Sequence, residues 1–183
     1  MALTLQLLKK LLTDPEASIN QIEKEKGSSA IVMATLNSVL IAISLGMISS
    51  NFQISVAFLV FSIIGTLLVS FLLHVALKVL GGRGDYWDSL KSVTFPFFGL
   101  TFSALIVSLL LKWNIYVAIM VGVLLNFIYI VTAFSSMLRI LKDTSKLEFI
   151  TVWIVFSILV MALVAGLYLG GFLLFLSKSA SLI

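Results

Sequence analysis

The sequence predicts an all-α protein: a polytopic transmembrane bundle of five helices preceded by a short amphipathic N-terminal segment. Two observations carry this prediction. Of the 183 residues, 61% are hydrophobic and only 11% are charged, whereas a soluble domain usually has about a quarter of its residues charged. The apolar stretches are also long and lack the alternating pattern of a membrane barrel. Because open strands cannot satisfy their backbone groups in lipid, helices are the predicted spanning elements.

Residues 1–29 are predicted to form a cytoplasmic amphipathic segment of two short helices. Leucines on either side of Lys9 and Lys10 predict that the first helix lies in the lipid headgroup region. The two lysines also interrupt the apolar stretch, and no small-residue cleavage site follows them. This start is therefore not interpreted as a signal peptide.

The second short helix has two candidate starts. Thr13 and Glu16 fit a capping box, whereas Asp14 could cap a helix that has Pro15 at its first position. The helix is expected to stop at Gly27, because glycine commonly ends helices.

The first two spans follow from a long stretch without charge. Residues 27–77 carry no formal charge, and one crossing takes about 20 residues, so this stretch holds two helices and a turn. The sequence Ser49–Asn51 offers the turn chemistry. The two spans are predicted at 30–49 and 53–77.

Three further charge-free stretches are each long enough for one crossing. They predict spans at 92–111, 115–138 and 150–176, which completes a transmembrane domain over residues 30–177. Pro96 falls in the first turn of the third span, where proline costs little.

The distribution of lysine and arginine predicts the orientation. The N-terminal segment and the loops after the second and fourth spans carry ten of the twelve basic residues, against Lys112 and Lys178 on the other side. All eight acidic residues share the basic side. The N-terminus is therefore predicted in the cytoplasm, and the tail at 178–183 outside.

Polar side chains recur at every fourth residue along the second predicted span: Ser62, Thr66, Ser70, His74 and Lys78. This spacing keeps them on one face of a helix. The face could form a polar track for headgroups, a small solute or protons. The alternative, which we favour, is that the hydroxyls bond to their own helix and allow close packing.

Asn37 and Asn126 fall near the middle of the first and fourth predicted spans. An amide at this depth is costly unless it is paired, so both are expected to face the bundle. They could hydrogen-bond across helices, the interpretation we favour, or line a substrate cavity.

Gly166 and Gly170 form a small-xxx-small motif in the fifth predicted span, with Gly171 adjacent. Such a motif allows two helices to approach closely. It predicts helix packing, either within the chain or between copies of it.

The loop after the second span has the most distinctive composition. Its candidate lipid or partner contacts are Gly81, Gly82, Arg83, Gly84, Tyr86, Trp87 and Lys91. Glycines would let backbone N–H groups approach an anion, the basic side chains could pair with phosphate, and the aromatic rings suit the membrane interface. An interfacial turn anchored by aromatic residues is the alternative, and we rate it slightly higher.

Catalysis has little support. No predicted span contains a carboxylate, which argues against an aspartyl intramembrane protease or a relay of buried acids. A dyad of Ser70 and His74 would lack a recognisable oxyanion hole. A metal site would have to combine His74 with Asp85 or Asp88, although zinc normally takes three or four protein ligands. We therefore expect no enzyme activity, no cofactor and no metal.

Two segments resemble the Yip domain family, membrane proteins named for interaction with Ypt/Rab GTPases. The first comprises Leu11–Glu16, Ile19 and Ile22. The second comprises His74–Gly84, Tyr86, Leu90 and Pro96. They are similar to the family's entry segment and to its loop after span two, which has paired glycines, a basic residue and a further glycine. The resemblance implies five helices with a cytoplasmic N-terminus.

Eukaryotic members of that family act in vesicle trafficking, partly through Rab GTPases, and carry a long cytosolic N-terminal region. Here only residues 1–29 precede the first span. The chain is therefore more similar to the compact bacterial or archaeal members, and a Rab-type GTPase is not the expected partner.

These observations predict a non-enzymatic protein of a prokaryotic cell membrane, with a role in membrane organisation or a trafficking-like process. It would act through lipids, other membrane proteins or further copies of itself at its cytoplasmic face, and not through nucleic acid. The alternative is a transporter or scramblase of a small solute or lipid that uses the polar track of span two with Asn37 and Asn126.

Overall fold

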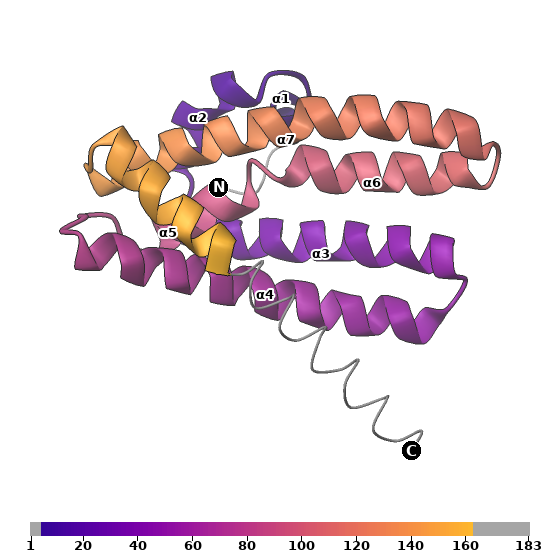
Figure 1. The fold of residues 1–183 in the computed structure, drawn as a ribbon, viewed down its shortest axis with the longest axis horizontal. Coiled ribbons are helices and arrows are strands. Elements are labelled where there is room, and N and C mark those ends of the chain that lie inside the picture. Colours follow the sequence, from indigo (N-terminus) through magenta and orange to yellow (C-terminus); the bar gives the residue numbers. More distant parts are fainter. Residues whose placement is uncertain (1–4, 163–183) are drawn as a thin grey trace, which may run out of the picture.

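The computed structural model describes residues 5–162, and every regular element in this part of the chain is a helix (Figure 1). The elements are α1 (Leu5–Thr13), α2 (Pro15–Lys24), α3 (Gly27–Ser49), α4 (Phe52–Val79), α5 (Tyr86–Thr94), α6 (Phe98–Leu111) and α7 (Ile115–Ser145), followed by the helix Phe149–Ala162. The predicted all-α class is thus confirmed for residues 5–162. Residues 163–176 of the predicted fifth span, with Gly166 and Gly170, and the tail at 178–183 lie outside the described residues.

Four helices are long and apolar enough to cross a membrane: Gly27–Ser49, Phe52–Val79, Tyr86–Leu111 and Ile115–Ser145. The third combines α5 and α6. The helix Phe149–Ala162 is apolar but shorter. The described chain is thus a multi-pass membrane protein by the length and composition of its helices.

The four long helices lie side by side in the order α4, α3, α6, α7 (Figure 1). The middle of this row is the more buried part: 33% of the apolar window of α3 and 44% of that of Tyr86–Leu111 are buried, against 11% for α4 and 17% for α7. The two edge helices therefore present wide apolar faces that only lipid or another protein can cover.

Asparagines build both short turns at one end of the row. The Asn51 side chain accepts hydrogen bonds from the N–H groups of Gln53 and Ile54 and caps α4. Asn114 caps α7 in the same way. Each cap satisfies N–H groups that the first turn of a helix leaves without a partner.

Pro96 does not lie in the first turn of one continuous helix. The structure ends α5 at Thr94 and starts α6 at Phe98, because proline has no N–H to continue the helical hydrogen bonds. The N–H of Phe98 donates to the carbonyl of Phe95, and the carbonyl of Thr94 instead accepts from the side chain of Asn37. The third span is thus a pair of helices with a break.

The N-terminal segment, which comprises α1 and α2, packs onto the helix row. Asp14 starts α2 by accepting from the N–H of Ala17, with Pro15 at the first position. Leu11 and Ile22 are at most 2% exposed and join a core cluster with residues of α3, α5, α6 and α7. The apolar face of α1 that contains Leu7 and Leu11 is therefore covered by protein, and the location of this helix in the headgroup region stays a prediction.

Gly27 begins α3 and does not end the second short helix. α2 already ends at Lys24, and Glu25 and Lys26 adopt extended backbone angles before α3 starts. A Cβ added at Gly27 would lie 2.5 Å from the ring of Trp87. The absence of a side chain at Gly27 therefore allows the Trp87 ring to pack directly against the start of α3.

The helix Phe149–Ala162 bridges the two edges of the row. Its Val152 and Val155 share a core cluster with Leu73 and Leu77 of α4 and with Met137 of α7. Both core clusters lie in the half of the molecule that also holds α1, α2 and α5. The buried apolar clusters of the described residues are therefore concentrated in this half.

Candidate functional site at the charged end

The charged end is the end of the helix row formed by the N-terminal segment, the loop 80–85 with α5, the last turns of α7 and the loop 146–148. Figure 1 shows these two loops at one end and the turns at 50–51 and 112–114 at the other. Of the basic residues in the described part of the chain, only Lys112 lies at the opposite end. Polar chemistry is therefore concentrated at one end.

The glycine loop, residues Gly81–Asp85, turns back against the protein. Gly81 has φ +85°, a conformation that favours glycine. The N–H groups of Gly81 and Gly82 donate to carbonyl oxygens near the end of α4 at 3.0 and 2.9 Å, and the N–H of Arg83 donates to Ser145 O at 2.9 Å. These N–H groups are thus occupied inside the protein, and an external anion would meet the exposed Arg83 side chain instead.

α5 starts with a reciprocal capping box. The N–H of Asp88 donates to Asp85 Oδ1 at 2.9 Å, and the N–H of Asp85 donates to Asp88 Oδ2 at 3.1 Å. Each side chain satisfies a backbone donor that the helix start leaves free. The box holds the end of the glycine loop in one conformation.

The two aromatic residues after Asp85 have different surroundings. Tyr86 is half-buried, packs edge-on against the ring of His74 and donates from its hydroxyl to Leu67 O at 3.3 Å. Trp87 lies over Gly27 and is 40% exposed. Tyr86 therefore anchors α5 to α4, while Trp87 keeps surface for an external contact.

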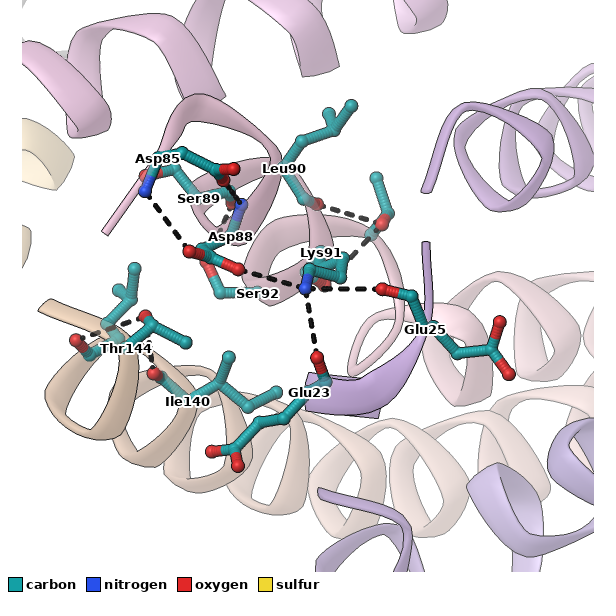
Figure 2. A network of polar contacts seen from close by, with 12 residues as sticks. Glu23, Glu25, Asp85, Asp88, Ser89, Leu90, Lys91, Ser92, Ile140 and Thr144 are labelled. Atoms are coloured by element: carbon teal, nitrogen blue, oxygen red, sulfur yellow. Dashed lines mark hydrogen bonds and ion pairs between the residues drawn. The ribbon is translucent and has the colours of Figure 1, made fainter. Parts of the chain in front are cut away.

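Lys91 is buried in a polar network that joins the N-terminal segment to α5 (Figure 2). It is only 5% exposed. Its Nζ lies 2.9 Å from Asp88 Oδ1 and donates to the carbonyls of Glu23 at 3.2 Å and Glu25 at 3.4 Å. A cation at these carbonyls complements the C-terminal end of α2. Lys91 thus caps a helix that is more than sixty positions earlier in the chain.

A second side chain caps α1 from within the row. The hydroxyl of Tyr129 on α7 donates to Leu12 O at 3.2 Å. The Tyr129 ring also lies against Gly99, where a Cβ would collide with it. Carbonyl groups at the ends of α1 and α2 therefore both accept hydrogen bonds from side chains of the transmembrane helices.

The predicted contact residues of the loop fall into three groups. Gly81, Arg83 and Trp87 are exposed, Gly84 and Tyr86 are half-buried, and Gly82 and Lys91 are buried. Only the first group can reach an external partner without rearrangement. Lys91 serves inside the protein, a role that the spacing of Asp85, Asp88 and Lys91 at three-residue intervals could have indicated.

A profile of the Yip1 domain matches residues 9–176, which is nearly the whole chain. The chain belongs to the Yip1 domain family. This match confirms the resemblance that the glycine loop and the entry segment indicated. No curated protein and no solved structure matches the chain.

In this Yip1-domain protein the space beside His74 is small. The cavity that His74, Lys78, Asp88 and Thr144 line has a volume of about 10 Å³, room for about one water molecule and not for a headgroup. Within residues 5–162 no group of three His, Cys, Asp or Glu side chains could hold a metal ion.

The polar track of the second span does not form one continuous lining. Ser70 is buried and bonds to Thr66 O of its own helix. Ser62 accepts from the Ser38 hydroxyl at 3.0 Å. Ser62 and Thr66 line a groove of about 540 Å³ between α3, α4 and α6, whereas His74 lines the separate small cavity.

Asn37 is 8% exposed and has partners for both ends of its amide. Its Nδ2 donates to Thr94 O at 2.7 Å, and its Oδ1 accepts from the hydroxyl of Thr101 at 3.1 Å. Asn37 therefore satisfies the carbonyl that the break at Pro96 releases.

Asn126 was expected to face the bundle, but the residue is exposed. Its amide is paired all the same: Oδ1 accepts from Ser103 at 2.9 Å and Nδ2 donates to Gly122 O at 2.8 Å. Pairing with its own helix and the next makes the exposed position tolerable in lipid.

Proposed function

We propose that this Yip1-domain protein is a non-enzymatic component of a prokaryotic cell membrane that acts through contacts made by its charged end. The contacts would be with lipid headgroups or with partner membrane proteins, in membrane organisation or a trafficking-like role. The charged end would face the cytoplasm, in keeping with its excess of lysine and arginine over the opposite end.

Five crossings are part of this proposal. Four helices of sufficient length are described, and Phe149–Ala162 starts again from the charged end. Residues 163–176 carry no formal charge. A crossing of about 20 residues would therefore end on the side opposite the N-terminus.

The observation that carries the proposal is the pairing of the two amides on the membrane-spanning helices. Both polar ends of Asn37 and of Asn126 have partners within the protein. A substrate pathway needs polar groups that are free to exchange partners, whereas a scaffold uses them to join helices. The surface left for recognition is then the exposed part of the charged end.

Arg83 and Trp87 are the contact residues that this surface offers best. Both are exposed and both are held by rigid elements: Arg83 by its N–H on Ser145 O, and Trp87 by Gly27 and the capping box of α5. A guanidinium and an interfacial tryptophan exposed at the same end of the molecule suit a phosphate group at the level of the headgroups.

The test is binding of phosphatidylglycerol and of phosphatidylcholine to the delipidated protein, measured by native mass spectrometry. We expect Arg83→Gln to lose most of the preference for phosphatidylglycerol. Arg139→Gln is the matched control, because Arg139 is also exposed near the charged end but lies on α7 outside the loop. Equal losses in both variants would contradict a specific role for the loop.

A transporter or scramblase is the second candidate, and the groove between α3, α4 and α6 is the observation in its favour. Asn37, Ser62, Thr66 and Thr101 give this groove a polar wall at mid-membrane depth. Liposome flux and lipid-scrambling assays would test it. Activity that Asn37→Leu or Thr66→Val abolishes would favour transport, and silence of the wild type would remove its support.

A further inference from the structure

A polar pocket lies at the end of the row opposite the charged end, beside the turn that joins α3 to α4 (Figure 1). Its volume is about 370 Å³, and Ser50, Asn51 and Lys112 contribute polar side chains to its wall. A Cβ added at Gly46 would collide with the Ser55 hydroxyl, so α3 and α4 are in close contact beside the pocket. The pocket therefore lies where the ends of α3, α4 and α6 meet.

Three donor groups of this pocket have no hydrogen-bond partner among residues 5–162: Lys112 Nζ, Asn51 Nδ2 and Ser50 Oγ. The oxygen of the Asn51 amide caps α4, and its nitrogen remains available. All eight acidic residues belong to segments of the charged end, so Lys112 has no counter-ion in the described part of the chain. A lysine in this situation pairs readily with a phosphate. The pocket thus has the chemistry of a phosphate site.

An apolar groove leads from this pocket toward the middle of the membrane. It has a volume of about 360 Å³ between α3 and α4, and it shares Ile43, Phe52 and Ser55 with the pocket. Val39, its residue farthest from the pocket on α3, lies eleven positions before Ser50, which corresponds to about 16 Å along a helix. Half of the hydrocarbon core measures about 15 Å. The pocket and the groove together therefore extend over one leaflet.

Exposed aromatic residues mark the level of the lipid headgroups at this end. Trp113 is 80% exposed and Tyr116 is 79% exposed, and both residue types are enriched at the interface between membrane and water. Trp113 directly follows Lys112 in the sequence. Lys112 is therefore placed at the depth of a lipid phosphate, while the groove extends into the hydrocarbon.

We propose that this pocket and groove bind one phospholipid, with its phosphate at Lys112 and one acyl chain between α3 and α4. The positive charge of Lys112 complements the phosphate, and the wall of the groove, apolar except for Ser55, complements the chain. The site is separate from the loop of Arg83, where Lys78 donates to the Arg83 carbonyl and places a second cation nearby. With a single cation, the Lys112 site is expected to bind phosphatidylglycerol and phosphatidylcholine alike. The inference does not depend on the contacts of the charged end.

Native mass spectrometry of the delipidated full chain tests the phosphate contact. Arg83→Gln is the parent for all variants, so that lipid contacts of the loop are read separately. Phosphatidylcholine is titrated, and diacylglycerol with the same acyl chains is the comparison because it lacks the phosphate. We expect the parent to bind phosphatidylcholine about tenfold more tightly than diacylglycerol, as a hydrogen bond to a charged group implies. Lys112→Gln should remove this difference.

The groove is tested by filling it from either wall. Val56→Trp and Ile43→Trp each add a large ring inside the groove, whereas Phe58→Trp changes an exposed residue of α4 outside it. The first two variants should weaken the binding of phosphatidylcholine, and Phe58→Trp should bind it as the parent does. Two blocking variants are made so that one that fails to fold, judged by gel filtration, leaves the other. Equal affinities of the parent for the two lipids, or binding that neither Lys112→Gln nor a folded blocking variant weakens, would overturn the proposal.

Photo-cross-linking from the groove identifies its occupant in native membranes. Benzoylphenylalanine replaces Leu59, which lines the groove on α4, in the full chain with and without Lys112→Gln. A phospholipid adduct that Lys112→Gln reduces would support the proposal. An adduct that is insensitive to Lys112→Gln would be bulk lipid, and a link to a second copy or to other residues of the same chain would assign the groove to protein. Each of these two results would overturn it.

Discussion

The charged end and the opposite half of the helix row are built on different principles. At the charged end, three layers of contact coincide: the two core clusters, the capped ends of α1 and α2, and the loop bonded to the end of α7. In the opposite half, large side chains are exposed: Phe61 is 72% exposed and Phe127 is 69% exposed. One half is held by protein, and the other depends on the lipid around it.

This contrast suggests how the protein carries a surface function. A contact surface must keep its shape whether or not a partner is bound, and rigid supporting elements give that property. The exposed residues Arg83 and Trp87 lie in the half that contains both core clusters. The lipid-facing half then serves mainly to place that surface at the membrane.

The largest effect should come from a pair of phenylalanine truncations. Phe95 is fully buried at the break between α5 and α6, whereas Phe61 on α4, in the opposite half, is 72% exposed. We expect Phe95→Ala to lower the free energy of unfolding by about 3–5 kcal/mol, the usual loss for a buried phenylalanine. Phe61→Ala should cost far less, because lipid replaces the lost contact. Denaturation in mixed micelles measures both, and equal losses would remove the contrast between the halves.

The next effect should follow from removal of the buried cation. Lys91→Met leaves Asp88 and the last carbonyls of α2 without their donor. Because the pair is only partly buried, we expect its loss to lower the free energy of unfolding by about 3 kcal/mol, the lower end of the range for buried pairs. Limited proteolysis should then cut near residues 24–26 in the variant. Lys142→Met, at an exposed position of α7, is the control and should behave as wild type.

A smaller difference is expected between the two membrane amides. Asn37→Leu would leave the carbonyl of Thr94 unsatisfied in a buried site, which costs about 2 kcal/mol. Asn126→Leu removes bonds at an exposed position and should cost about 0.6 kcal/mol. The thermal unfolding of both variants can be compared by circular dichroism. A larger loss of stability for Asn126→Leu than for Asn37→Leu would mean that the break at Pro96 does not depend on the hydrogen bond from Asn37.

The smallest difference between a variant and its matched partner is expected for the hydroxyl that caps α1. Tyr129→Phe removes the hydrogen bond to Leu12 O and should cost about 1 kcal/mol, seen as faster hydrogen exchange in α1. Tyr116→Phe is the matched control, since Tyr116 is 79% exposed at the opposite end. If exchange in α1 is unchanged in Tyr129→Phe, the N-terminal segment is held by its apolar contacts alone.

The helices themselves were largely predictable, because charge-free stretches and asparagine turns are local features of the sequence. The Asp14 cap with Pro15 was one of two starts that could be written down from the residues. The break at Pro96 was not predicted, because a proline near a helix start is compatible with a continuous helix. Only the hydrogen bond that Asn37 donates to the carbonyl of Thr94 distinguishes a broken helix from a continuous one.

The candidate site was predictable in its composition and not in its exposure. The spacing of Asp85, Asp88 and Lys91 indicates a partner for Lys91 within α5, but its burial depends on the α2 carbonyls that the fold brings to it. Gly27 was predicted as a helix stop because glycines end helices, and its packing against Trp87 is a contact between distant parts of the chain. Such long-range contacts decide which members of a motif remain available to a partner.

Tryptophan quenching by spin-labelled lipid tests the central claim most directly, because the chain has a tryptophan at each end, Trp87 and Trp113. Single-tryptophan variants are reconstituted in vesicles that contain spin-labelled phosphatidylglycerol or phosphatidylcholine. The account predicts that phosphatidylglycerol quenches Trp87 more strongly, that Arg83→Gln removes this preference, and that Trp113 shows none. Equal quenching by the two lipids at Trp87, or the same preference at both ends, would contradict it.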